Sequence, residues 1–117
     1  MNIISPTLSL VIPCFNETDN IKSTLNAISD YLRNNYPRMD YEILPINDGS
    51  TDDTLSLIAE FSKHHPQVIS GFGFEKNCGR GAAIKYGIAV SKGAYVICLD
   101  ADLSYDVNHI GEILNSF

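Results

Sequence analysis

The sequence predicts an α/β fold in which a Rossmann-like parallel sheet is flanked by helices. Short apolar runs alternate with segments whose apolar residues recur at helical spacing, and this alternation occurs four times along 117 residues. Strands that are connected through helices pair in parallel by right-handed crossovers. The content of 44% hydrophobic and 19% charged residues is ordinary for a globular domain. We therefore expect four βα units in a single domain over residues 1–117.

The first βα unit begins with an apolar run at residues 8–12, which predicts a strand that Pro13 closes. Asn16 and Thr18 are the candidate N-caps of the helix that follows. This helix should end at residues 34–37, where a proline follows two asparagines and a tyrosine. Four apolar residues at helical spacing place one face of the helix against the sheet: Ile21, Leu25, Ile28 and Leu32.

The second unit contains a strand at residues 41–46 and a helix that should end at residues 64–66. Pro45 cannot donate a ladder hydrogen bond, so we expect it on an edge strand or at a bulge. Ser50 and Asp53 have the spacing of a capping box at the start of the helix. The apolar face of this helix comprises Leu55, Ile58 and Ala59.

The last two units follow the same pattern. A third strand is expected at residues 68–74, and the glycine-bearing loop 77–81 opens the next helix. The apolar run at residues 94–99 predicts a strand that is buried on both faces. Asp106 is the expected N-cap of a final helix. Its apolar face comprises Ile110, Ile113, Leu114 and Phe117. The alternation of strands and helices stops at Phe117, which predicts a fragment of a longer domain.

The composition argues against some kinds of partner and some cellular locations. The net charge of −6 argues against a nucleic-acid partner, because such partners require a basic surface. Cys14, Cys78 and Cys98 are odd in number and lack C-x-x-C spacing, which is typical of free thiols in a reducing compartment. The sequence shows no signal peptide and no apolar run long enough to span a bilayer. We expect a cytoplasmic location, or one at the cytoplasmic face of a membrane.

Acidic or glycine-rich segments follow every expected strand. Asp100 and Asp102, separated by Ala101, come directly after the fourth strand, and Asp48 follows the second. The carboxyl ends of parallel strands meet at one edge of the sheet, where ligands of open α/β folds bind. Two neighbouring carboxylates repel each other unless a divalent cation joins them, and hard cations prefer oxygen ligands. Alone, an Asp-x-Asp pair is a weak signal, because it also suits a solvated turn.

Four motifs in order resemble family 2 glycosyltransferases of the GT-A fold, most of all the dolichyl- and undecaprenyl-phosphate hexosyltransferases. The motifs VIPCFNE, NDGSTDDT, KNCGRGAA and DADLS lie at residues 11–17, 47–54, 76–83 and 100–104. The resemblance covers almost the whole chain and implies the N-terminal, nucleotide-binding half of the GT-A fold. The chain departs from the family at Pro45 within a strand, at Cys78, and at Arg80, where lysine is frequent.

The resemblance implies roles for the segments at three strand ends. Pro13, Phe15 and Glu17 would line the base and ribose of a nucleotide, and the carboxylate of Asp48 would contact the base. The glycine loop would pass near the nucleotide and its phosphates with three residues, Gly79, Arg80 and Gly81.

The same resemblance implies that Asp100 and Asp102, with Ala101 between them, hold the diphosphate of a UDP- or GDP-linked sugar through Mg²⁺ or Mn²⁺. A bridging metal stabilises the negative charge that grows on the leaving diphosphate. The reaction would invert the anomeric carbon, and the acceptor would be a polyprenyl phosphate or a glycan hydroxyl. A hydroxyl acceptor needs a general base, and no residue of this chain is assigned to that role. A homo-oligomer is a further expectation.

Other function classes also suit acids at strand ends. A receiver-like phosphoacceptor module would carry one acceptor aspartate on a middle strand and a lysine after a later one, but a capping-box pattern follows Asp48 instead. A nucleotide-binding scaffold without catalysis would keep the same cleft. A dinucleotide oxidoreductase is disfavoured, because no G-x-G-x-x-G follows the first strand.

Overall fold

A parallel sheet of four strands forms the centre of the computed structural model, which describes residues 6–103 and 106–116. The strands are β1 (Leu8–Cys14), β2 (Tyr41–Asp48), β3 (Phe72–Phe74) and β4 (Tyr95–Cys98). The helices are α1 (Ile21–Asn35), α2 (Thr54–His64), α3 (Arg80–Val90) and α4 (His109–Leu114). The predicted α/β class and its four βα units are confirmed. Among the described residues, no helix combines the length and apolar content needed to cross a membrane.

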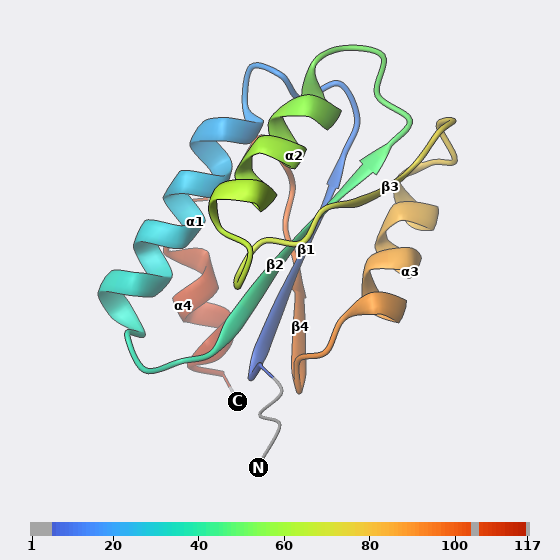
Figure 1. Ribbon diagram of the computed structural model, residues 1–117. Coiled ribbons are helices and arrows are strands. Elements are labelled where there is room, and N and C mark those ends of the chain that lie inside the picture. The colour runs from blue at the N-terminus through green and yellow to red at the C-terminus, as the bar shows by residue number, and fades with distance from the viewer. Residues whose placement is uncertain (1–5, 104–105, 117) are drawn as a thin grey trace.

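Helices cover both faces of the sheet (Figure 1): α1, α2 and α4 lie on one face and α3 lies on the other. Side chains alternate along β1, so Leu10 and Ile12 join the core on the α1 side while Val11 packs with Ala83 of α3. Gly87 allows α3 to approach β1, because a Cβ there would lie 2.3 Å from Cγ1 of Val11. The alternation therefore builds two cores from one strand.

The strand order is β3-β2-β1-β4. β1 pairs with β2 on one side and with β4 on the other, in parallel register on both. The chain thus leaves β1 in one direction and later returns to its opposite side. This reversal creates the crevice at the carboxyl ends of β1 and β4 in which open α/β folds bind ligands.

Pro45 lies in a central strand whose register is continuous on both sides, so the expectation of an edge strand or a bulge is wrong. It pairs with Ile12 of β1. On the other side of β2 the ladder is interrupted: an isolated bridge joins Ile43 to Ile69, and pairing resumes at Ile46 and Phe72. Proline has no N–H to donate, and the interruption beside it is where such a residue is tolerated. The same interruption reduces the strand predicted at residues 68–74 to β3.

β4 is partly exposed, so the prediction of a strand buried on both faces is wrong. Tyr95 and Val96 are 45% and 37% exposed, whereas Ile97 is 4% exposed and belongs to the core on the α1 side. β4 is the last strand in the order, and β1 is its one hydrogen-bonded neighbour within the described ranges. An apolar run does not distinguish an edge strand from a central one.

The helix starts also differ from prediction. α1 begins after Asn20 rather than after Asn16 or Thr18, and no side chain caps it. α2 begins after Asp53 without a side-chain cap, so the capping box of Ser50 and Asp53 does not form. The predicted cap residues bind a neighbouring loop instead, because tertiary partners outcompete the local helix ends.

The last helix, α4, is preceded by Asn108 rather than by Asp106. Asp106 accepts a hydrogen bond from the backbone N–H of Asn108 at 2.9 Å and so starts the turn before the helix. Ile110 is buried, as its place on the apolar face predicted. Two residues of the sequence predictions, Ser104 of the fourth motif and Phe117 of the apolar face, lie outside the described residues.

Candidate functional site

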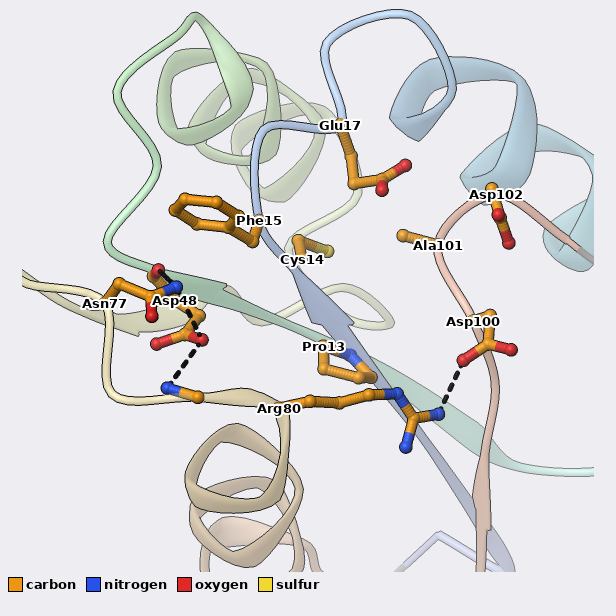
Figure 2. A pocket seen from close by; sticks show the side chains of 11 residues that line it. Pro13, Cys14, Phe15, Glu17, Asp48, Asn77, Arg80, Asp100, Ala101 and Asp102 are labelled. Atoms are coloured by element: carbon orange, nitrogen blue, oxygen red, sulfur yellow. Dashed lines mark hydrogen bonds and ion pairs between the residues drawn. The ribbon is translucent and has the colours of Figure 1, made fainter.

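A cleft of about 450 Å³ lies at the carboxyl ends of β1, β2 and β4 (Figure 2). Four separate segments of the chain line it, and the structure brings together all predicted site residues except Gly81. Cys14 and Asn77, which sequence reasoning assigned no role, also line it. The predicted residues in the lining are Pro13, Phe15, Glu17, Asp48, Gly79, Arg80, Asp100, Ala101 and Asp102.

Asp48, at the end of β2, anchors the glycine loop. Its side chain is 3% exposed. Oδ1 accepts a hydrogen bond from the backbone N–H of Cys78 at 2.6 Å, and Oδ2 accepts from the N–H of Gly79 at 3.0 Å and from Nδ2 of Asn77 at 3.1 Å. Hydrogen bonds to an ionised carboxylate are stronger than neutral ones. Asp48 therefore fixes the shape of the loop, while its predicted contact with a nucleotide base stays a prediction.

Glycine is required at Gly49, where the chain turns away from β2. Its φ is +67°, and a Cβ at this position would lie 2.2 Å from the backbone N of Asn77. Gly79 also has a positive φ, +99°, directly before α3. These two left-handed positions let the loop after β3 pack against the end of β2.

Arg80, the first residue of α3, reaches across the cleft to Asp100. Its Nη2 lies 2.5 Å from Oδ1 of Asp100, and the two side chains are 60% and 29% exposed. Four acids line the cleft: Glu17, Asp48, Asp100 and Asp102. Among the described residues of the lining, Arg80 is the one cation. At about 4 Å and an effective dielectric of 20, each pair of like charges costs roughly 4 kcal/mol. A diphosphate would therefore need further positive charge to bind here.

The turn after β4 presents the Asp-x-Asp pair at the rim of the cleft. The hydroxyl of Thr24 in α1 donates to the backbone oxygen of Ala101 at 2.5 Å, and this contact is buried. Leu103 adopts a left-handed φ of +47°, and its backbone N–H donates to the backbone oxygen of Asp100 at 3.0 Å. The turn is thus held by α1, while Asp102 remains exposed.

The donor set fits a divalent cation that is shared with a ligand. Within the described residues, no group of three or more His, Cys, Asp or Glu side chains could enclose a metal ion. Asp100 and Asp102 nevertheless supply carboxylate oxygens at one rim. Mg²⁺ commonly binds through one or two carboxylates, with water and substrate phosphates completing its coordination. The residues suit such an open site, not a closed metal cage.

Cys14 lines the cleft as a protonated thiol. Its side chain is 1% exposed. Burial, together with the nearby charge of Glu17, raises the pKa of the Cys14 thiol to about 12. A neutral thiol is a poor nucleophile and a poor metal ligand, so Cys14 serves as an apolar wall of the cleft. Its place at the end of an apolar strand was the one sequence signal that could have assigned Cys14 to the wall of the cleft.

Comparison with known proteins agrees with this geometry. The family model described as "Glycosyl transferase family 2" matches residues 9–117. The chain is 37% identical over 99 residues to a poly-β-1,6-N-acetyl-D-glucosamine synthase of Staphylococcus epidermidis, covering 85% of this chain and 22% of that protein. It is 32% identical over 108 residues to a dolichyl-phosphate β-glucosyltransferase of Trichomonas vaginalis, covering 90% of this chain and 32% of that protein. The chain thus spans a third or less of the length of these relatives.

A solved structure shows the same fold. A mannosyltransferase from Pyrobaculum calidifontis, in complex with GDP-Man and Mn²⁺, matches with a TM-score of 0.78 and 24% identity. The match covers 95% of this chain and 32% of that one. The predicted parallel α/β sheet of the GT-A fold is therefore confirmed. Together, the family match and the order of the four motifs show that this chain belongs to glycosyl transferase family 2.

Proposed function

We propose that residues 1–117 form the nucleotide-sugar-binding domain of a metal-dependent, inverting glycosyltransferase. The observation that supports this most directly is the single cleft at the carboxyl edge of the sheet. Glu17, Asp48, Arg80 and the Asp-x-Asp pair surround it, although they come from four distant parts of the sequence. Convergence of this kind is expected of a ligand site.

The donor would be a UDP- or GDP-linked sugar. Among proteins of similar fold, S. aureus TarS has been solved with UDP-GlcNAc and the Pyrobaculum mannosyltransferase with GDP-Man. In Figure 2 the ring of Phe15 lies on the Asp48 side of the cleft, and the carboxylate of Glu17 lies on the side of Asp102. Phe15 is 46% exposed and offers an apolar face for a base. The base would therefore occupy the Phe15 side and the diphosphate the Asp102 side.

The residues around the diphosphate would act through charge. Asp100 and Asp102 would hold Mg²⁺ or Mn²⁺, and the guanidinium of Arg80 would supply a fixed cation beside them. A divalent cation bound there would act as a Lewis acid on the leaving diphosphate. The acceptor oxygen would attack the anomeric carbon from the opposite face. The glycosidic C–O bond would break with its electron pair passing to the diphosphate, which inverts the configuration.

The acceptor would be a polyprenyl phosphate or a glycan hydroxyl. The names of the relatives support both classes, since one is a dolichyl-phosphate β-glucosyltransferase and another a polysaccharide synthase. An ionised phosphate can attack directly, whereas a hydroxyl must lose its proton to a base. No described residue of the cleft is assigned as that base. We further propose action in the cytoplasm or at the cytoplasmic face of a membrane.

Thermal unfolding with UDP, GDP and their sugar conjugates, with and without Mn²⁺, tests this proposal. A ligand at about 100 times its dissociation constant stabilises the folded state by about 2.7 kcal/mol. We expect stabilisation that depends on Mn²⁺ and that Asp102→Ala abolishes. Asp19→Ala is the matched control, because it removes an exposed carboxylate outside the cleft lining. A response that ignores Mn²⁺, or no response in the folded protein, contradicts the proposal. Binding without turnover by the full-length protein would instead indicate a scaffold.

A further inference from the structure

The loop that carries Phe15 and Glu17 into the cleft is held by the loop after β2. Three consecutive backbone N–H groups of the first loop donate to three side chains of the second. These are Asn16 N to Ser50 Oγ at 3.0 Å, Glu17 N to Thr54 Oγ1 at 2.8 Å, and Thr18 N to Asp52 Oδ2 at 3.3 Å. We call residues 16–18 and 50–54 the loop clamp.

The clamp is reciprocal. The backbone N–H of Thr51 donates to Oδ1 of Asn16 at 2.8 Å, and the N–H of Asp53 donates to Oγ1 of Thr18 at 3.2 Å. Asn16 adopts a left-handed φ of +53°, a conformation that asparagine tolerates better than most residues. Each loop therefore satisfies the backbone of the other, and neither conformation depends on its own sequence alone.

Asp52 and Thr54 form the centre of the clamp. Thr54 is fully buried. Its hydroxyl accepts the N–H of Glu17 and donates to Oδ1 of Asp52 at 2.5 Å, and its own N–H donates to the same oxygen at 2.9 Å. Asp52 is exposed, so its slight desolvation is outweighed by the hydrogen bonds from Thr18 and Thr54, which lower the pKa of Asp52 to about 2. At neutral pH the hydroxyl of Thr54 thus connects an ionised carboxylate to the backbone of Glu17.

We propose that Asp52, acting through Thr54, is a positioning residue that sets the affinity of the cleft for a nucleoside diphosphate. Neither side chain is part of the cleft lining. Thr54 accepts the backbone N–H of Glu17, two residues from Phe15, and Asp52 accepts that of Thr18, just before α1. The inference rests on the proposed function, because the ligand is the nucleotide of the donor. A misplacement of about 1 Å can lower the rate of a reaction up to 100-fold, and we expect a loosened clamp to lower the nucleotide affinity measurably as well.

Titration calorimetry with UDP and GDP at saturating Mn²⁺ tests the proposal. Asp52→Asn should raise the dissociation constant of the nucleotide that binds by about tenfold. Asp19→Asn is the matched control: it removes the same charge from an exposed residue that adjoins the clamp, and it should bind like the parent. Thr54→Val should resemble Asp52→Asn, whereas Thr54→Ser retains the hydroxyl and should restore affinity. Thermal unfolding of each variant without ligand ensures that affinities are compared between folded proteins.

A second measurement reports on the loop without any nucleotide. Cys14 precedes Phe15 and is buried, so in a Cys78→Ser, Cys98→Ser background its labelling rate reports opening of the first loop. Asp52→Asn should label faster than Asp19→Asn. Equal dissociation constants for these two variants overturn the inference, even if Cys14 labels faster. A folded parent that binds no nucleoside diphosphate overturns the proposed function and this inference with it.

Discussion

The guanidinium of Arg80 lies 2.5 Å from the carboxylate of Asp100 and so joins the glycine loop to the Asp-x-Asp turn across the cleft. Arg80 opens α3 and Asp100 follows β4, two elements on opposite sides of the crevice beside β1. The arginine side chain is 60% exposed, and ion pairs at such positions contribute about 0–1 kcal/mol to stability. The contact matters more for the charge that it places beside the acids.

Removal of the Arg80 charge should weaken nucleotide binding with little effect on stability. Arg80→Ala should raise the dissociation constant for a nucleoside diphosphate by about tenfold, or about 1.4 kcal/mol. The free energy of unfolding should change by less than about 1 kcal/mol. Arg80→Lys should recover only part of the affinity, because lysine keeps the charge and loses the forked geometry. Calorimetry and urea unfolding measure the two quantities; equal affinity in all three proteins would show that Arg80 does not meet the ligand.

Asp48→Asn should destabilise the protein by about 2–4 kcal/mol. The buried carboxylate accepts three hydrogen bonds, and an amide keeps only one of the two acceptor oxygens, so its NH2 group would face the N–H of either Cys78 or Gly79. Buried N–H groups that lose their acceptor cost about 1–3 kcal/mol each. Urea unfolding measures the effect. The exposed Asp19→Asn should stay within about 0.5 kcal/mol of the parent, and an equally small effect for Asp48→Asn would contradict its anchoring role.

Gly49→Ala should destabilise the protein by at least about 2 kcal/mol. A Cβ at Gly49 would lie 2.2 Å from the backbone N of Asn77, and φ is +67°. Backbone cannot yield as a flexible side chain can, and a residue with a Cβ is strained at this φ. For a domain of this size, the expected loss lowers the midpoint of thermal unfolding by roughly 8 °C or more. At about 4 °C per kcal/mol, a midpoint within 2 °C of the parent corresponds to a loss below about 0.5 kcal/mol. Such a small loss would contradict the close approach of Gly49 to Asn77.

Gly81→Ala should have the opposite effect. A Cβ at Gly81 meets no atom within 4 Å, and the residue lies in the first turn of α3. Alanine favours helix over glycine by up to about 1 kcal/mol, so thermal unfolding should show a neutral or stabilised protein. Gly81 is the predicted site residue that the cleft lining omits. Unchanged nucleotide affinity would agree with that position, while a marked loss would place the phosphates against this helix turn.

Ionisation of Asp52 should make the stability of the protein depend on pH. Its folded-state pKa of about 2 is below the ordinary value of 3.8. The ionised carboxylate therefore stabilises the folded protein fully above about pH 4, and this contribution disappears as the pH falls through about 2. Urea unfolding should show Asp52→Asn less stable than the parent at pH 7, with the difference shrinking toward pH 2. A difference that is constant over this range would show that Asp52 titrates alike in both states.

Much of the architecture could be read from local patterns. Apolar spacing located all four helices, and α1 ends at Asn35 and α2 at His64, within the ranges that the breaker residues predicted. Because parallel strands align their carboxyl ends, the acids and glycines after the strands could be assigned to one edge. The positions of Asp48 and Asp102 at a shared cleft follow from that reasoning. The spacing of apolar residues is a local property of short segments, so it can be read from one sequence without knowledge of the tertiary structure.

Contacts between distant segments escaped those patterns. Asn16, Thr18 and Ser50 carry the side chains of helix caps, yet each binds the neighbouring loop, because a hydrogen-bond partner in that loop competes with the nearby helix end. Pro45 is tolerated in a central strand because the ladder beside it is interrupted. Composition and spacing alone thus established the class of fold and the edge at which the site lies. Which side chains line the cleft and which brace it depended on hydrogen bonds between residues thirty or more positions apart, and these form only when the chain has packed.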